Sequence, residues 1–171
     1  MENEAERRDR FSGLLELHRK IVFKVINTYC RQPQDRDDLS QEITYQLWRA
    51  FPAYDPSRTF STWMYRIALN VAISYVRNTR RRQIVSMDSQ LDGLVDNSTS
   101  DPEANEQVRE LYRFIDQLDP LTRALLLLYL EEHRYSEIAE ILGITETNVA
   151  TKISRLKQRL TDELNPTDQE H

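Results

Sequence analysis

Apolar residues recur at three- and four-residue steps along most of the chain, and no segment alternates as a strand would. The first of these runs predicts a helix over residues 4–31, ended by Arg31-Gln32-Pro33. Its inward positions are Phe11, Leu14, Leu15, Leu17, His18, Ile21, Val22, Val25 and Ile26. A second helix is predicted from Asp35, acting as its cap, to about Phe51. Leu39, Ile43, Leu47 and Trp48 form its inward face.

Two prolines then interrupt the helical pattern. Pro52 and Pro56 lie too close together for a continuous helix, so the sequence predicts a loop up to Thr59. Ser57 or Thr59 is the expected cap of a third helix, which covers residues 60–82.

Periodicity is lost over residues 83–103, where Ser, Asp, Asn, Gly and Thr dominate. Further helices are predicted over residues 104–118, from Pro120 to about Glu132, over 135–142 and over 146–163, with Asp119 as a cap before Pro120. The pattern therefore predicts an all-α fold of two small helical domains, residues 1–82 and 104–171. An acidic flexible linker, residues 83–103, joins them.

Charge is distributed in blocks of one sign. The 171 residues have a net charge of −5, which by itself argues against nucleic-acid binding. However, residues 60–82 contain five arginines and no acid, while residues 83–119 contain nine acids and two arginines. Blocks of this kind are interpreted locally, so a basic surface is still expected.

Several function classes are disfavoured by composition. The longest apolar run, Ala124 to Leu130, is too short for a membrane span, and no leader pattern opens the chain, so no membrane insertion is expected. Cys30 is the only cysteine, which excludes an intrachain disulfide and suggests a reducing cytosol. The histidines are scattered, and adjacent carboxylates such as Asp37 and Asp38 point apart on a helix, so the sequence predicts no metal and no cofactor.

The helix over residues 60–82 combines cations with aromatic rings. Its arginines are Arg66, Arg77, Arg80, Arg81 and Arg82, and its aromatic residues are Phe60, Trp63, Tyr65 and Tyr75. Cations bind phosphates and aromatic faces stack unpaired bases, so this helix suits DNA that is being opened. The alternative is an amphipathic core helix with a basic end.

A second DNA-binding pattern lies between Tyr135 and Leu160. Ala139 is small where two helices would cross, Gly143 suits the turn, and Thr145 can cap the second helix. Val149, Ile153, Leu156 and Leu160 form an inward stripe, and Asn148, Thr151, Lys152, Arg155 and Arg159 point elsewhere. This spacing predicts a helix-turn-helix whose second helix enters a major groove. The alternative is an ordinary helical hairpin with a solvated basic face.

Together these motifs resemble the extracytoplasmic-function (ECF) sigma factors over residues ~10–162. The most specific stretches are Asp37-Asp-Leu-Ser-Gln-Glu-Ile-Thr-Tyr-Gln-Leu-Trp-Arg-Ala-Phe51 and Thr59-Phe-Ser-Thr-Trp-Met-Tyr-Arg-Ile-Ala-Leu-Asn70. The family pattern there is an acidic pair, Leu, Gln-Glu and a Trp, followed by Phe-x-Thr-Trp-Leu-Tyr-Arg-Ile-Ala-x-Asn. The resemblance implies a bacterial, cytoplasmic sigma subunit without bond chemistry of its own.

The resemblance also implies roles for individual residues. Asp38, Leu39, Gln41 and Glu42 would dock on a coiled coil of the largest subunit of core RNA polymerase. Tyr54, Asp55, Ser57 and Arg58, in the loop 53–59, would hold a base flipped from the −10 element of promoter DNA. Arg66 and Asn70 would contact the same strand, and Arg80, Arg81 and Arg82 the upstream backbone. Thr145, Asn148, Thr151, Lys152, Arg155 and Arg159 would read the −35 element. An anti-sigma factor is a further expected partner.

Two positions depart from the family pattern, and one rival function remains open. Ala150 stands where Lys or Arg is common, and Arg134 where a capping Ser or Thr is usual. The rival is a free-standing helix-turn-helix regulator whose N-terminal domain dimerises or binds a ligand. Co-purification with core polymerase separates the two. A DNA-processing enzyme lacks support, because no further ligand completes a metal site around Asp37, Asp38 and Glu42.

Overall fold

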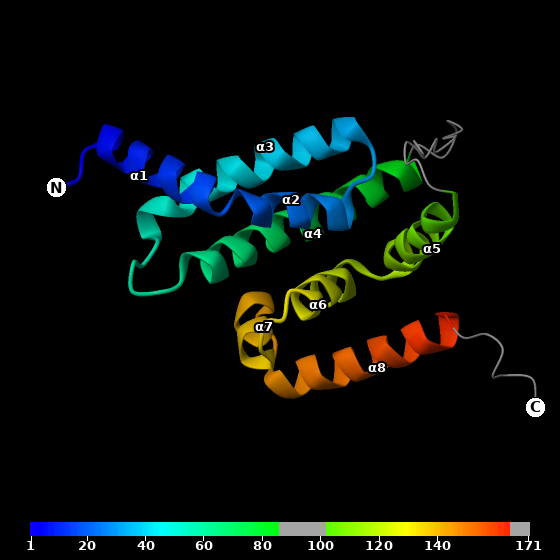
Figure 1. The fold of residues 1–171 in the computed structure, drawn as a ribbon. Coiled ribbons are helices and arrows are strands. Elements are labelled where there is room, and N and C mark those ends of the chain that lie inside the picture. The colour runs from blue at the N-terminus through cyan, green and yellow to red at the C-terminus, as the bar shows by residue number, and fades with distance from the viewer. Residues whose placement is uncertain (86–101, 165–171) are drawn as a thin grey trace, which may run out of the picture. The chain divides into compact units, whose positions relative to one another are not determined.

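The computed structural model describes residues 1–85 and 102–164, and the elements in these two ranges are helices (Figure 1). The chain divides into two compact units, Met1–Gly93 and Leu94–His171. The predicted all-α fold is confirmed. Among the helices of the described ranges, none combines the length and hydrophobicity that crossing a membrane requires.

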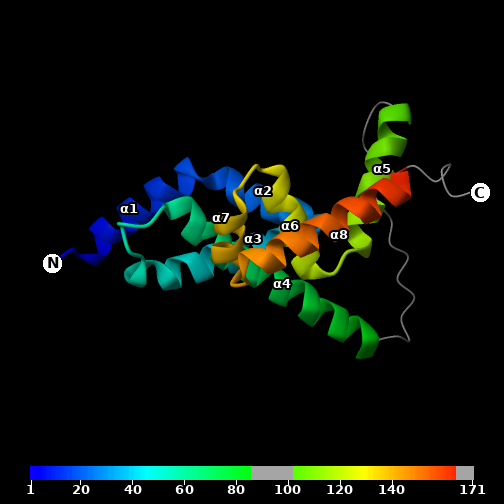
Figure 2. The ribbon, with the colours of Figure 1, turned by 90° about the horizontal axis from the view of Figure 1, so that it is seen from below.

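The first unit packs three helices around one core. Its elements are α1 (Glu4–Leu17), α2 (Arg19–Tyr29), α3 (Pro33–Ala50), the short 3₁₀ helix η1 (Phe51–Ala53) and α4 (Phe60–Val85). Helices α2, α3 and α4 contact one another along their lengths, and the two views agree on this arrangement (Figures 1 and 2). The fully buried side chains include Val25, Leu39, Ile43, Leu47, Met64, Ala68, Leu69 and Ala72. Val25, Leu39, Ile43 and Leu47 are among the inward positions that the periodicity predicts.

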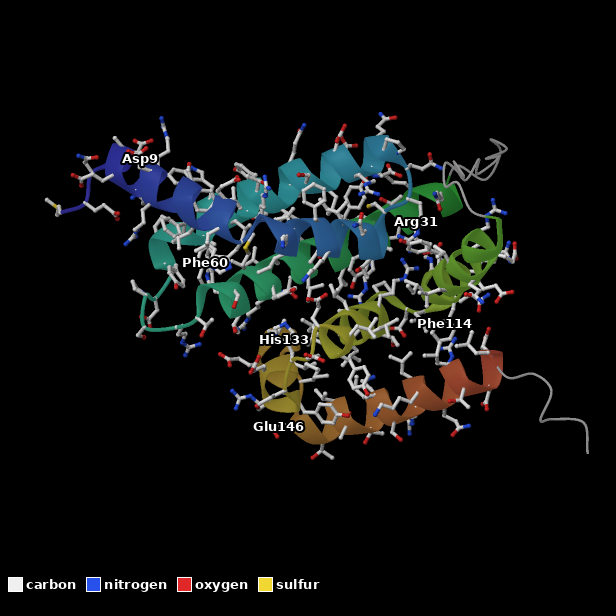
Figure 3. All side chains as sticks on the ribbon, viewed as in Figure 1. Asp9, Arg31, Phe60, Phe114, His133 and Glu146 are labelled. Atoms are coloured by element: carbon white, nitrogen blue, oxygen red, sulfur yellow. The ribbon has the colours of Figure 1, made fainter. Side chains whose placement is uncertain are left out.

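The single helix predicted over residues 4–31 is wrong, because the chain breaks at His18. This residue has φ −109° and ψ 16°, and it ends α1 and begins α2. Its ring lies 5.1 Å from the ring of Phe60 at the start of α4, where Figure 3 labels Phe60. Leu17, expected to face inward, is exposed instead. No glycine or proline marks the break, so local sequence does not reveal this tertiary contact.

One predicted cap is wrong, and one of two alternative caps is excluded. Helix α3 begins at Pro33, with Gln32 at the cap position, because proline suits the first helical residue. Asp35 therefore lies in the first turn of α3, where its carboxylate accepts a hydrogen bond from the Tyr75 hydroxyl at 3.3 Å. Thr59, one of the two expected caps of α4, directly precedes that helix, and its carbonyl accepts from the Trp63 amide. The Ser57 hydroxyl donates to Asp55, so Ser57 is not the cap.

The second unit contains α5 (Pro102–Gln117), α6 (Pro120–Leu130), α7 (Tyr135–Leu142) and α8 (Glu146–Leu164). Its core includes a cluster of Phe114, Leu118, Leu126 and Leu156. Asp119 caps α6 as predicted, accepting from the Thr122 amide. Buried Arg123 donates to the carbonyls of Asp116 and Leu118, at 2.8 and 3.0 Å, and so satisfies the end of α5.

The two helices that flank the predicted linker, residues 83–103, extend into it. Helix α4 continues to Val85 and α5 begins at Pro102, so both ends of the predicted linker are helical. The remainder of the predicted linker, residues 86–101, lies outside the described residues.

Two left-handed residues shape the turns of the second unit. Gly143 has φ 69° and ends α7, and its amide and that of Ile144 donate to the Ala139 carbonyl. Glu132 has φ 61° after α6, where the His133 amide donates to the Leu128 carbonyl. Glycine adopts this conformation readily, whereas a side chain there costs free energy. The turn after α7 thus has the glycine that its conformation favours, whereas the turn after α6 has a glutamate.

We therefore expect opposite effects from exchanging these residue types. Gly143→Ala meets no atom within 4 Å, so its cost arises from φ alone, about 1–2 kcal/mol of unfolding free energy. Glu132→Gly removes that strain, which stabilises the fold, but it also raises the entropy of the unfolded chain, which destabilises it. We expect the unfolding free energy to rise by about 0.5 kcal/mol on balance. Hydrogen exchange of the slowest α8 amides reports both values. A stabilised Gly143→Ala variant would contradict this account.

Candidate nucleic-acid interface

A cluster of aromatic rings supports the loop between η1 and α4. Phe51 is buried and stacks on Tyr54, with centroids 6.0 Å apart and planes at 13°. Tyr54 also contacts Trp63 at 5.0 Å and Phe60 at 5.4 Å, and these two rings contact each other at 5.2 Å. The rings thus join the end of α3 to the start of α4 and form a rigid base for the loop.

The loop itself is held by its own polar groups. The Tyr54 hydroxyl donates to the Arg58 carbonyl at 2.8 Å. Asp55 accepts from both the amide and the hydroxyl of Ser57, at 3.0 and 2.8 Å. The Ser57 amide, and then its hydroxyl, lower the pKa of the Asp55 carboxyl below its ordinary value. Asp55, Ser57 and Arg58 are exposed, so a loop held by its own hydrogen bonds presents polar groups to solvent.

An exposed polar stripe begins beside this loop and follows α4. Arg66 and Asn70 lie one turn apart on its outer face, and Ser74, Arg77 and Arg81 continue the stripe. The adjacent Arg80 and Arg82 are exposed as well. The whole helix contains neither Asp nor Glu. Such a surface attracts anions over about 20 Å of helix.

A groove between α3 and α4 brings the two groups of predicted site residues together. Asp38 and Glu42 line it from α3, and Asn70, Asn78 and Arg82 line it from α4. The Gln46 amide donates to Glu42 at 2.9 Å. The α3 edge is therefore acidic and the α4 edge is basic. Because phosphates are repelled by carboxylates, an anionic ligand is favoured at the α4 edge of the groove.

The other predicted docking residues lie apart from this groove. Gln41 lines a second groove, between α1 and α3, together with Tyr45 and Trp48. Leu39 is fully buried among the core residues of the first unit. Its side chain anchors α3 in the core, and it is not accessible to a partner.

Tyr75 connects the two walls of the α3–α4 groove. Its hydroxyl donates to Asp35, 40 residues earlier in the chain. Burial first, and then the charge of Asp35, raise the pKa of Tyr75 to about 12. The neutral phenol is thus favoured in the folded state.

Helix α8 has the faces of a recognition helix. The Thr145 hydroxyl accepts from the Asn148 amide at 3.1 Å, which confirms the predicted cap, and Val149, Ile153 and Leu156 are buried. Asn148, Thr151 and Arg155 are exposed on the side away from this core. Lys152 is half-buried. The Arg159 guanidinium lies 5.9 Å from the Phe114 ring centroid, so this residue flanks the exposed face.

The first helix of this motif lacks an N-cap side chain, as the departure at Arg134 suggests. Arg134 makes no capping bond. Glu137 instead receives the Arg134 Nε–H at 3.2 Å and lies 3.0 Å from His133 Nδ1, labelled in Figure 3. These contacts fix the turn before α7. In the described ranges no three His, Cys, Asp or Glu side chains group as metal ligands would.

Two family matches account for both units. Sigma-70 region 2 matches residues 14–82, and sigma-70 region 4 matches residues 108–160. The chain belongs to the sigma-70 family. Region 2 contains the aromatic cluster, the loop and α4, and region 4 contains the helix-turn-helix.

Relatives along most of the chain belong to the ECF class of this family. The ECF RNA polymerase sigma factor SigM of Bacillus subtilis is 27% identical over 149 residues, covering 86% of this chain and 90% of SigM. The ECF RNA polymerase sigma-E factor of Escherichia coli is 28% identical over 167 residues, covering 91% and 87%. The chain is an ECF RNA polymerase sigma factor, as the resemblance predicts. A free-standing regulator is not favoured, because it leaves the region 2 match unexplained.

Solved sigma factors share the fold. CnrH, in complex with the cytosolic domain of CnrY, has a TM-score of 0.68 at 20% identity, covering 94% of this chain and 90% of CnrH. RpoE of Bartonella quintana, in complex with the anti-sigma factor NepR, has a TM-score of 0.71 at 17% identity, covering 92% and 98%.

Sequence reasoning missed several polar residues of the first unit. Gln46 and Asn78 line the α3–α4 groove, and Ser74 lies in the α4 stripe. Their spacing of four and eight residues from Glu42 and Asn70 is a signal that was available in the sequence.

Tyr75→Phe should lower the stability of the first unit by about 1 kcal/mol at neutral pH, through the lost hydrogen bond. The phenol has a raised folded-state pKa, so its stabilisation is complete below pH 10.0 and is lost as the pH rises toward about 12. The variant should therefore lose less stability than the wild type over this range.

Urea unfolding followed by tryptophan fluorescence checks this prediction, because both tryptophans, Trp48 and Trp63, lie in the first unit. Tyr45→Phe is the control, since Tyr45 is exposed. Identical alkaline curves for wild type and Tyr75→Phe would exclude the proposed role of the Tyr75 phenol.

Proposed function

We propose that this sigma factor divides its contacts between three surfaces. Helix α3 docks on core RNA polymerase, the loop 53–59 with α4 captures the melted −10 strand, and α8 reads the −35 duplex. The observation that carries this proposal is the acid-free stripe on α4, which begins beside a rigid, exposed loop.

The docking surface consists of Asp38, Gln41 and Glu42. These side chains are exposed along the outer side of α3, while Leu39 and Ile43 hold the helix in the core. Carboxylates opposite a basic DNA track are suited to a protein partner, because they repel phosphate and attract a cationic protein surface. Exposed Tyr45 extends the same surface with an aromatic ring, a residue type that is enriched in protein interfaces.

Strand capture combines a shaped loop with charged and polar contacts. A base that leaves the duplex loses stacking and pairing, so a pocket and contacts to its edge must compensate. Tyr54, Asp55, Ser57 and Arg58 would form the pocket. The Asn70 amide offers a donor and an acceptor to a base edge, and Arg66 offers a cation to the strand. Arg80, Arg81 and Arg82 would follow the upstream backbone.

Recognition of the −35 element belongs to the exposed side of α8. Asn148, Thr151 and Arg155 would reach base edges, and Thr145 lies at the helix N-terminus, which favours a phosphate. Lys152 and Arg159 would contact the backbone from the flank of the helix. Ala150 leaves one side of this surface without a cation.

The partners follow from these surfaces. We propose core RNA polymerase and promoter DNA as partners in the bacterial cytoplasm, where the polymerase, and not this subunit, makes bonds. An anti-sigma factor is proposed as a regulator, since two proteins of the same fold were solved with a bound partner, a CnrY domain and the anti-sigma factor NepR.

The docking proposal is tested by a double change in α3. Gln41→Ala with Glu42→Lys should weaken binding to core polymerase by about tenfold or more, equal to ~1.4 kcal/mol, because it removes a contact and reverses a charge. Fluorescence polarisation with labelled sigma factor measures the affinity. Glu4→Lys, an exposed charge reversal on α1, is the control. Unchanged affinity in a double variant that unfolds normally would refute this docking surface.

The capture proposal is tested by Asn70→Ala. We expect about tenfold slower opening of a duplex promoter and little change in closed binding, because the contact forms only after the base leaves the duplex. A template already unpaired at −10 should partly rescue the defect. Permanganate reactivity of unpaired thymines measures opening, and Gln83→Ala, which removes an exposed amide near the end of α4, is the control. Equal defects on duplex and unpaired templates would count against base capture.

A further inference from the structure

Helix α1 begins before the region 2 match, which starts at residue 14. Its first turns are charged and are ordered by a capping box, in which Asn3 and Glu6 each accept the other's backbone amide, at 2.8 and 3.0 Å. Among the residues of α1, only Phe11 is buried. Other contacts must therefore hold this helix on the domain.

Those contacts join α1 to two aromatic rings. The Arg7 guanidinium lies 5.7 Å from the Trp48 ring centroid, and that of Arg10 lies 4.9 Å from Phe51. The Phe11 ring contacts both of these aromatic rings, with its centroid 5.3 Å from that of Trp48 and 5.1 Å from that of Phe51. The three α1 residues have the spacing of one helical face, so they contact the aromatic cluster as a group.

The contact continues into the strand-capturing loop. Phe51, under Arg10, stacks on Tyr54, and the Tyr54 hydroxyl holds the Arg58 carbonyl. One ring therefore separates the Arg10 guanidinium from the residue that begins the loop. Movement of Phe51 would release Tyr54 and, with it, the far side of the loop.

The charge of Arg10 is already partnered. Glu2 lies 3.3 Å from its Nε and accepts from its Nη2 at 3.3 Å. A guanidinium that is paired with a carboxylate and packed on a ring is better suited to holding that ring than to binding a DNA phosphate.

We propose that Arg7 and Arg10 are positioning residues, which brace Trp48 and Phe51 from α1 and so maintain the shape of the strand-capturing loop. The functional part of this inference rests on the capture function proposed for that loop. The chain thus has, outside the region 2 match, a device that lowers the cost of ordering the loop when a base is captured.

The test compares two variants of the full chain. Arg7→Ala with Arg10→Ala removes both ring contacts and leaves Phe11 in place. Arg8→Ala is the control, because Arg8 is exposed and paired with Glu4. Amide exchange by NMR measures the loop directly. In the double variant the Ser57 and Arg58 amides should exchange about five to ten times faster, as expected for two lost cation–π contacts.

A functional readout distinguishes positioning from charge. A promoter is first identified by run-off mapping. Holoenzyme is then bound to a DNA fragment of this promoter in which the −10 element is unpaired. The Arg7 and Arg10 double variant should bind this DNA about fivefold more weakly, whereas the affinity of Arg8→Ala for it should equal that of the wild type. The affinity of the double variant for a −35 duplex should also be unchanged. Arg7→Lys with Arg10→Lys keeps a cation over each ring and should recover most of the affinity.

Two results would overturn the proposal. Wild-type exchange at Ser57 and Arg58 in the double variant would show that α1 does not hold the loop. An equal loss of affinity in Arg8→Ala would assign the effect to charge alone. If Asn70→Ala leaves strand capture unchanged, the capture function proposed for the loop is wrong. The exchange rates of the Ser57 and Arg58 amides would still decide whether α1 positions the loop.

Discussion

The burial of Phe51 under a set of aromatic rings is the constraint on which the first unit depends. An exposed loop of polar residues has no core of its own, so it keeps one shape only if its ends are fixed. Phe51 and Tyr54 fix one end, and Phe60 and Trp63 fix the other. The same cluster sets the exit of α3 and the start of α4. The surface proposed for polymerase and the surface proposed for DNA therefore have a common base.

Charge then separates the uses of these surfaces. The net charge of −5 gives no indication of DNA binding, because the acids and arginines are sorted by element. Asp38 and Glu42 line one side of a groove, and the acid-free helix α4 forms the other. Phosphates are attracted to one wall and repelled by the other, so in the proposed function a DNA strand and a protein partner would use different side chains.

Sequence alone predicted features with a local cause. The left-handed turn at Gly143, the Thr145 cap and the buried stripe of α8 all follow from spacing and residue type. Features that depend on distant contacts were not predictable. The break at His18 coincides with a contact to Phe60, and Asp35 is engaged by Tyr75, 40 residues away. Among the site residues, buried Leu39 and the Arg159 contact with Phe114 show the same limit. Sequence spacing predicts which face of a helix a side chain occupies, but it does not predict which residue of another helix that side chain contacts.

The central claim is that this chain gives core RNA polymerase its promoter specificity, and run-off transcription tests it most directly. Purified core polymerase is supplied with bacterial genomic DNA, with and without the chain, and the 5′ ends of the transcripts are sequenced. The account predicts a set of start sites that appear only with the chain and share two upstream sequence elements at a constant spacing. Specific DNA binding by the chain alone, with no new start sites when core polymerase is present, would contradict it.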